Sequence, residues 1–573
     1  MEPRSLWRAF PPGVCFVVLT GFLGLTLLLY RPCLDGPPIS DDYAYLLNPW
    51  VVSPQPRDLA SVLSPTSQAT RTLHNYAPVR ALLHALEWRL FPQDAPAYHT
   101  TNLMAHAVAS TLLVAFLVDL GVAVVPAALA GGIFLLHPAN VEAVAWMNQL
   151  WSPVALAFVL LALLALPRRP GWATAAFVLA LGSKPLAVCA LPTAAALEWC
   201  RSGSVGDAPR AGGGGRWRWL ALWTLLCVAF SVAQVRAAAG SGPLDPLYPN
   251  LAVAIRAIAV FAARYLVMAT TSIGVAAFQE PPLPLSPWDP WWLASLAVLS
   301  LLAWRWWSRL RARDPEAIGW TWTVAAYAPV AQVFPFLYPM ADRYLYFLLP
   351  GLLIATTLGF QQSLARIGDA ERRGSAARLA AALALGLALF FGWRTAGRVP
   401  LWRSEEALLH DSAARFPDGV SAQLLRSRRA AEAGDVEGAI APLREAAGRG
   451  WDYYDSLLSH PAYARVRTDP RFQAFVRELA GRSIERSRRV TWLTQLDWMQ
   501  LADAHALRGE TRAALDSLEK GLAIGGPLDP QLRARRDRLQ SSVPSPAPDA
   551  ALPGEGHSGQ GSSSSRRDRT LAP

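Results

Sequence analysis

Apolar runs of about 17–25 residues recur through residues 1–395, and each is long enough to cross a bilayer as a helix. Of the 573 residues, 53% are hydrophobic and only 17% are charged, against roughly a quarter charged in soluble domains. This abundance of apolar residues excludes a disordered chain, and the length of the apolar part argues against one soluble globule. The pattern predicts an all-α protein with a polytopic membrane domain over residues 1–395.

The chain changes character twice after this apolar part. Residues 396–540 are polar and rich in Arg and Glu, with the apolar periodicity of helices. Residues 541–573 are mainly Pro, Gly and Ser with scattered charge, and they carry too little apolar surface for a core. We therefore expect a helical domain over 396–540 and a disordered tail over 541–573.

The charge balance and the cysteines exclude other classes of protein. The chain has 53 basic and 42 acidic residues, a net charge of +11, and 51 of the basic residues are Arg. Such a skew is typical of a GC-rich genome, so we expect no nucleic-acid partner. The five cysteines form no CxxC pair and have no His at zinc-ligand spacing, which predicts neither a disulfide scaffold nor a structural zinc site.

The arginines between the apolar runs predict the topology, because cytoplasmic loops are enriched in Lys and Arg. The first run, 12–30, follows a short basic segment and is expected to be an uncleaved span with a cytoplasmic N-terminus. The segment 171–199 has arginines beyond both ends, so we expect two crossings with Lys184 at the outer turn. The run 251–273 fits a re-entrant or interfacial helix. The further spans, which bring the total to eleven with the C-terminus outside, are expected near 98–118, 121–137, 150–167, 217–236, 290–307, 318–338, 344–361 and 377–394.

This topology places two adjacent carboxylates, Asp41 and Asp42, just outside the first span. Two like charges side by side raise the pKa of one carboxyl, which suits a general base near neutral pH. The pair could equally ligate a metal or cap the N-terminus of a helix. The sequence leaves all three interpretations open.

The span near 98–118 carries a polar stripe. His99, Asn102, His106 and Ser110 fall within about 80° on one face of a helix. A polar stripe in a membrane helix marks either a site or a contact between helices.

More polar residues are expected at the same external face. A proline breaks the helix after His137 and leaves His137 and Glu142 at the external mouth. Lys184 is the only Lys in the membrane part, and Arg343, followed by Tyr344, begins another span. Such cations often anchor to lipid headgroups. Together with the carboxylates and imidazoles, they would also suit a lipid phosphate or pyrophosphate.

The C-terminal domain contains an internal repeat with an offset of 75 residues. A helix, a Gly turn and a second helix with a small residue at the crossing are typical of a tetratricopeptide-type unit. Such units bind partners on a concave face, but a purely structural helical hairpin fits as well. The matching residues are Gly434, Ala439 and Leu443, then Gly509, Ala514 and Leu518.

Taken in order, these motifs resemble a known family. An Asp-Asp loop is followed by Tyr-His-x-x-Asn-x-x-x-His, His-Pro-x-x-x-Glu-Ala-Val-Ala, a Lys at a broken helix, Arg-Tyr-Leu-Tyr and external repeats. Over about 30–540, the chain is similar to the transmembrane, tetratricopeptide-bearing O-mannosyltransferases that modify cadherins in animals, and to their bacterial relatives. The resemblance implies the GT-C glycosyltransferase fold and a polyprenyl-phosphate sugar used at the external face.

Four positions depart from the pattern of that family. Its Tyr-Arg-Pro, Gly-Arg, Lys-Glu and Glu-Arg-Tyr segments correspond here to Tyr76-Ala77-Pro78 with Arg80 nearby, Asn148-Gln149, Lys184-Pro185 and Asp342-Arg343-Tyr344. The departures concern the contacts with the sugar and the lipid, and they leave the Asp pair untouched.

The resemblance implies roles for single residues and partners. Asp41 and Asp42 would be catalytic. Substrate or donor binding would fall to Arg80, His99, Asn102, His106, His137, Glu142, Lys184, Arg343 and Tyr344. No residue is assigned to a metal, no cofactor is certain, and a divalent metal stays an open option. The partners would be membrane lipid, the polyprenyl-phosphate donor and an acceptor protein or glycan, the latter held by the C-terminal helices.

Two other classes of function compete with a transferase. One is a non-catalytic membrane scaffold whose external repeats bind a cell-envelope partner, and the other is a carrier for a lipid-linked sugar. A scaffold has no use for eleven spans, and a carrier is expected to show inverted repeats, which the sequence lacks. An external site implies the periplasmic side of a bacterial inner membrane, which the Arg usage favours, or the lumen of the endoplasmic reticulum.

Overall fold

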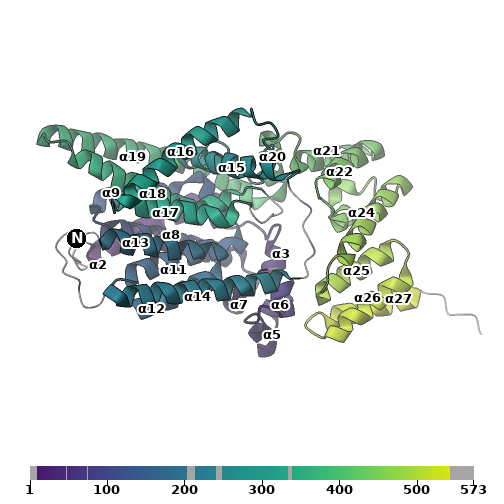
Figure 1. Ribbon diagram of the computed structural model, residues 1–573. Coiled ribbons are helices and arrows are strands. Elements are labelled where there is room, and N and C mark those ends of the chain that lie inside the picture. The colour runs from purple at the N-terminus through teal and green to yellow at the C-terminus, as the bar shows by residue number, and fades with distance from the viewer. Residues whose placement is uncertain are drawn as a thin grey trace, which may run out of the picture.

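The computed structural model describes residues 10–46, 48–73, 75–202, 213–239, 248–332 and 339–542. Within these ranges the chain is all-helical, as predicted, and the only β geometry is an isolated bridge between Gln279 and Met340. Long helices run side by side, and helices α20–α27 gather at one end of them (Figure 1). Most of the tail predicted over 541–573 lies outside the described residues.

The membrane part consists of twelve main helices in the described ranges, joined by short helical turns. They are α2 (Pro12–Tyr30), α8 (Ala95–Asp119), α9 (Val124–Leu136), α11 (Trp151–Ala165), α12 (Pro170–Ser183), α13 (Ala190–Arg201), α14 (Gly213–Ala238), α15 (Leu251–Thr271), α16 (Pro290–Arg311), α17 (Glu316–Tyr327), α18 (Asp342–Ala365) and α19 (Ala370–Arg398). The loop between α2 and α8, which the sequence predicts to be external and which we call the external loop, contains short helices: α3 (Asp42–Tyr45), α4 (Pro49–Val52), α5 (Pro56–Ser61), α6 (Gln68–Arg71) and α7 (Pro78–Leu90). Helix α10 (Val141–Ala145) follows the break after α9.

Length and composition indicate an integral membrane protein. Seven helices of the described part are long and apolar enough to cross a bilayer, or up to eight if the bent pair α9 and α10 is one span. The eleven expected spans also include α12, α13, α16 and α17, which are shorter or less apolar. Large apolar side chains such as Leu225, Leu301 and Leu389 are exposed, as helices facing lipid require.

The ionic residues separate to the two ends of the helix bundle. At one end, which we call the inner end, Asp119 accepts hydrogen bonds from Arg168 and Arg201, each at 3.1 Å. Arg309 donates to Asp314 over 2.9 Å at the same end. These arginines are among those that the sequence places in the cytoplasm.

The same contacts test the expected double crossing of 171–199. Arg168 precedes α12 and Arg201 ends α13, yet both reach Asp119. The chain therefore leaves the inner end along α12, turns at Lys184 and returns along α13. Lys184 lies at the opposite, outer end.

Helix α15 contacts three other segments of the membrane part between Ile258 and Ala269. Tyr327, the last residue of α17, donates its hydroxyl to the carbonyl of Ile258, and Tyr265 bonds to Ala341, just before α18. His137, just after α9, bonds to the carbonyl of Ala269. Helix α15 is also long and apolar enough to span a bilayer, so the re-entrant or interfacial arrangement expected from the sequence stays a prediction.

The C-terminal helices contain the two predicted hairpins. Gly434 and Gly509 have φ of 81° and 77° and make the turns, in a left-handed conformation that glycine adopts without strain. Ala439 and Ala514 are fully buried where the helices cross. The helices are α20 (Glu405–Arg415), α21 (Val420–Ala433), α22 (Val436–Gly448), α23 (Tyr454–Ser459), α24 (Pro470–Arg488), α25 (Gln495–Leu507), α26 (Thr511–Ile524) and α27 (Asp529–Ser542).

The C-terminal helices dock on the outer end at two places. At the first, Asp411 of α20 accepts hydrogen bonds from Arg398 at 3.1 Å and from the backbone N–H of Ala277 at 2.9 Å. At the second, Leu518 and Met499 share an apolar cluster with Trp50 and other residues of the external loop. The loop that follows the first span is thus packed between the membrane helices and the C-terminal helices.

Candidate functional site

The two adjacent carboxylates of the external loop have different surroundings. Asp42 is fully buried. Its Oδ2 accepts the backbone N–H of Ile39 at 2.9 Å, and its Oδ1 accepts the backbone N–H of Asn148 at 2.7 Å. Burial raises the pKa of Asp42 to about 7, and the charge of Asp41 adds to the effect, while the two N–H donors oppose it. Asp42 therefore ties the external loop to the segment before α11.

Asp41 is exposed to solvent. The surrounding protein nevertheless excludes enough water to raise the pKa of Asp41, and the guanidinium groups of Arg343 and Arg80 oppose this rise. An accessible carboxylate with a raised pKa is suited to accept a proton from an incoming hydroxyl.

A partly buried ion pair joins α10 to α18 next to this carboxylate. The backbone N–H of Arg343 donates to Oε2 of Glu142 at 2.6 Å, and the Arg343 guanidinium donates to Oε1 of the same carboxylate. The guanidinium carbon lies 5.2 Å from the ring centroid of Tyr344 and 5.7 Å from that of Trp146. Glu142 thus fixes Arg343 at the outer end of α18, where its side chain stays 20% exposed.

Lys184 is buried at the turn between α12 and α13, where Pro185 prevents the helix from continuing. Its ammonium donates to Oγ of Ser152 at 2.6 Å and lies 4.7 Å from the centroid of the Trp151 ring. Ser152 in turn donates to Oε1 of Gln149 at 3.1 Å. The Trp151 indole N–H donates to the same oxygen at 2.9 Å. This chain of bonds holds the ammonium in one position.

A third cation, Arg80, approaches the same indole from the external loop. Its guanidinium carbon lies 4.4 Å from the Trp151 centroid, and the residue is 2% exposed. Helix α7 comes this close because Gly182 has no side chain. A Cβ at Gly182 would lie 2.7 Å from Cγ2 of Val79. Trp151 therefore links Arg80 to Lys184 through its π face.

The polar stripe of α8 forms contacts within the protein. Nε2 of His99 lies 3.4 Å from the carbonyl of Gly36. Asn102 donates to the carbonyl of Trp146 at 2.8 Å. His106 bonds to the hydroxyl of Tyr346 at 2.8 Å and to the carbonyl of Leu135 at 3.1 Å. The geometry favours the interpretation of this stripe as a contact between helices.

His137 is likewise engaged at the break after α9. Its Nδ1 accepts the backbone N–H of Ala139 at 3.2 Å, and its Nε2 lies 3.2 Å from the carbonyl of Ala269. The ring packs edge-on against Phe391 at 4.5 Å. His137 thus joins the broken helix to α15.

The predicted residues therefore form a charged group and a group that supports it. Asp41, Arg80, Lys184 and Arg343 interact electrostatically around Glu142, while the three histidines, Asn102 and Asp42 hold the surrounding segments. Sequence reasoning missed Ser152 and Trp151, and it noted Gln149 only as a departure from a motif. Neither Ser152 nor Trp151 carries a signal of its own, because the cations that they contact, Lys184 and Arg80, lie more than 30 positions away in the sequence.

The chemistry of the group follows from its charges. Three cations and one accessible carboxylate can bind an anionic group beside a hydroxyl that must lose its proton. Among the described residues, no group of three or more His, Cys, Asp or Glu side chains is placed to hold a metal ion.

Comparisons with known proteins are sparse. No family model matches the chain, and no curated protein matches it either. A search of solved structures finds a distant similarity to ArnT from Cupriavidus metallidurans bound to undecaprenyl phosphate. The TM-score is 0.34 and the sequence identity is 13%, over 87% of this chain and 79% of that chain.

Proposed function

We propose that this protein is a GT-C-type membrane glycosyltransferase that moves a mannose-like sugar from a polyprenyl-phosphate donor to a hydroxyl group at the external face. The acceptor is a protein side chain or an envelope glycan. One observation supports the proposal above others. Arg80, Lys184 and Arg343 come from three distant parts of the chain and interact with one another at the outer end, where Arg80 and Arg343 also interact with the accessible Asp41.

The reaction assigns one task to each member of this group. Asp41 accepts the proton of the acceptor hydroxyl as its oxygen attacks C1 of the sugar. The bond from C1 to the phosphate oxygen breaks, and its electron pair stays on the phosphate. Lys184 and Arg343 stabilise that growing negative charge, an electrostatic effect that is often the largest contribution to catalysis. A single displacement of this kind inverts the configuration at C1.

The remaining predicted residues have positioning roles in this proposal. Glu142 fixes Arg343, and Asp42 fixes the loop that carries Asp41. His99, Asn102 and His106 connect α8 to the segments around the site. Because all three side chains are buried and each makes at least one contact within the protein, we assign them no direct contact with the donor.

The C-terminal helices border the acceptor side of the site in this proposal. Tyr453, in the loop before α23, interacts electrostatically with Asp41 and is exposed. An exposed aromatic ring beside the general base offers an apolar surface against which an acceptor can pack. This gives the C-terminal domain a role in acceptor binding.

Transfer by the purified protein tests the proposal. The full chain in nanodiscs is supplied with a polyprenyl-phosphate mannose, and Ser/Thr peptides and oligosaccharides are offered in separate reactions. Mass spectrometry and product stereochemistry should show an inverted glycoside in one of the two. Transfer to neither acceptor, with donor bound but unchanged, would contradict a transferase and support the carrier. Absence of donor binding would support the scaffold.

A further inference from the structure

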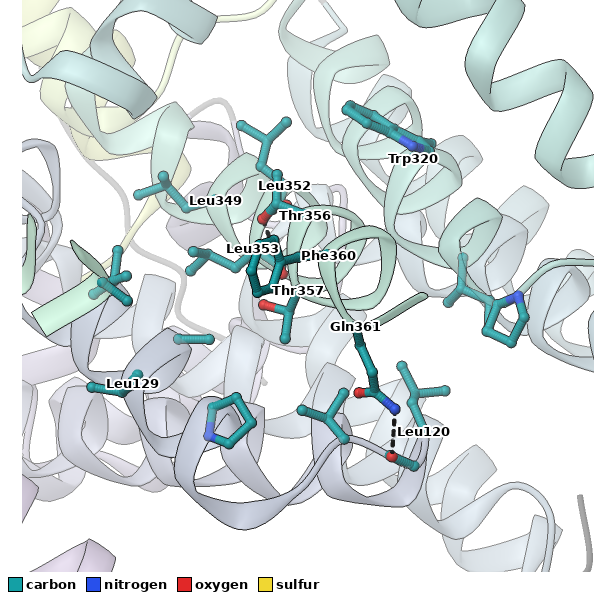
Figure 2. A pocket seen from close by; sticks show the side chains of 18 of the residues that line it. Leu120, Leu129, Trp320, Leu349, Leu352, Leu353, Thr356, Thr357, Phe360 and Gln361 are labelled. Carbon is teal, nitrogen blue, oxygen red and sulfur yellow. Dashed lines mark hydrogen bonds between the residues drawn. The ribbon is translucent and has the colours of Figure 1, made fainter. Parts of the chain in front are cut away.

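A large apolar cavity lies within the membrane part, away from the site described above. It has a volume of about 2750 Å³ and lies between α9, α15, α16, α18 and α19. Figure 2 shows side chains of α18 along it, among them Leu349, Leu352, Leu353, Thr356, Thr357 and Phe360. Neither Asp41, Lys184 nor Arg343 lines the cavity. It is therefore a second site, separate from the proposed reaction.

The cavity is suited to acyl chains. At about 30 Å³ for each water, its volume corresponds to about 90 water molecules, but its mainly apolar lining offers them few hydrogen-bond partners. Cavity-lining residues on α18 run from Leu349 to Leu364, a length of about 22 Å at 1.5 Å per residue. Half of a bilayer core is about 15 Å thick, so lipid chains from one leaflet fit within this length.

The inner end of the cavity carries a positive charge. Its lining includes Arg168, Arg201 and Arg313, with Arg378 a little further along α19. The acidic residues of the lining are Asp119 and Glu198, so arginines outnumber carboxylates by four to two. Basic pockets between helices on the cytoplasmic side favour anionic lipid headgroups. A neutral lipid gains nothing from this excess charge.

We propose that the cavity binds one anionic diacyl phospholipid from the inner leaflet. Its headgroup lies among the four arginines at the inner end, Arg168, Arg201, Arg313 and Arg378, and its acyl chains extend along α18. The exposed indole of Trp217, which also lines the cavity, suits the boundary between headgroup and chains. The lipid fills the gap between the α9–α19 side and the α15–α16 side of the bundle. The proposal does not depend on the transferase activity.

Native mass spectrometry of the full-length protein tests the headgroup. Detergent-solubilised protein is offered equal amounts of phosphatidylglycerol and phosphatidylcholine, and the bound lipid is identified by mass. We expect one retained phosphatidylglycerol. Arg313→Gln and Arg378→Gln should each reduce the preference for phosphatidylglycerol about fivefold. These two are chosen because Arg168 and Arg201 hold the buried Asp119.

The matched controls are Arg372→Gln and Arg373→Gln, which lie near the same end but do not line the cavity. They should leave the preference unchanged. A third variant, Ala384→Trp, places a large side chain in the cavity and should reduce retention of phosphatidylglycerol without changing the elution of the protein. Equal retention of the two lipids or retention of neither would each overturn the proposal. Polyprenyl phosphate is then added as a competitor, and displacement of the bound phosphatidylglycerol would overturn the proposal as well.

Discussion

Single substitutions of Asp41 and Asp42 distinguish the proposed catalytic base, Asp41, from the carboxylate that positions its loop, Asp42. Asp41→Asn removes an exposed carboxylate that faces two guanidinium groups. Asp42→Asn changes a buried carboxylate whose oxygens each accept one backbone N–H. Both substitutions keep the size of the side chain, so they differ mainly in which function they remove.

The structure gives different magnitudes for the two variants. Asn at position 42 has one carbonyl oxygen, so either Ile39 or Asn148 loses its acceptor, and a buried N–H without a partner costs about 1–3 kcal/mol. Loss of a general base typically lowers the rate about 10²–10⁴-fold, which is about 3–5 kcal/mol of transition-state stabilisation. Asp41→Asn should therefore lose at least 100-fold in rate with an unchanged unfolding temperature. Asp42→Asn should unfold at a lower temperature and keep more of its activity.

Donor-dependent transfer and thermal unfolding, measured on the same preparations, distinguish these outcomes. Arg372→Gln, an exposed change at the opposite end, is the control for handling. If Asp41→Asn transfers sugar at nearly the wild-type rate, Asp41 is not the base and the proposed mechanism is wrong. If Asp42→Asn alone abolishes transfer with unchanged stability, the roles of the two residues are reversed.

Three further predictions concern Lys184, its hydrogen-bond partner Ser152 and the buried carboxyl group of Asp42. Lys184→Gln should lower kcat about 10²–10³-fold, because it removes a charge at the leaving phosphate. Lys184→Arg should keep only part of the wild-type kcat, because a planar, forked guanidinium cannot replace a compact ammonium group. Ser152→Ala should raise the donor KM or lower kcat about tenfold while thermal stability changes little, and donor titrations would show it. The raised pKa of Asp42 means that the folded protein holds a proton which the unfolded chain releases between about pH 4 and pH 7. This contribution to stability is complete at low pH and is lost as the pH rises through about 7, so the wild-type unfolding temperature should fall relative to Asp42→Asn over that range.

The sequence could predict those features that depend on local pattern or on charge. The arginines beyond both ends of 171–199 correctly predicted that Lys184 lies at the end opposite to them, because the enrichment of Arg in cytoplasmic loops can be judged for each loop by itself. The repeated Gly434 and Gly509 correctly marked two helical hairpins, since each glycine occupies a left-handed turn. Neither inference needed to know which helices are neighbours.

The rest depends on contacts between distant segments. Nothing near Asp41 or Asp42 in the sequence shows that one side chain is buried and the other exposed, because the donor from Asn148 arrives more than 100 positions later. The sequence pattern of the polar stripe on α8 is the same whether its side chains bind a ligand or a backbone carbonyl group. Only the fold shows that His106 is occupied by Tyr346 and Leu135.

The C-terminal helices stabilise the loop that carries the proposed base, and this bears on what they can bind. Leu518 and Met499 pack against Trp50 in the external loop, and the backbone N–H of Gln495 donates to Gln68 at 3.1 Å. Part of the surface that a repeat domain would offer to a partner is therefore covered by the chain itself. An external loop of many short helices has little core of its own, so this packing reduces the mobility of Asp41 relative to Lys184 and Arg343. Catalysis requires such placement within a fraction of an ångström, which gives the C-terminal helices a reason to lie at the outer end even before an acceptor binds.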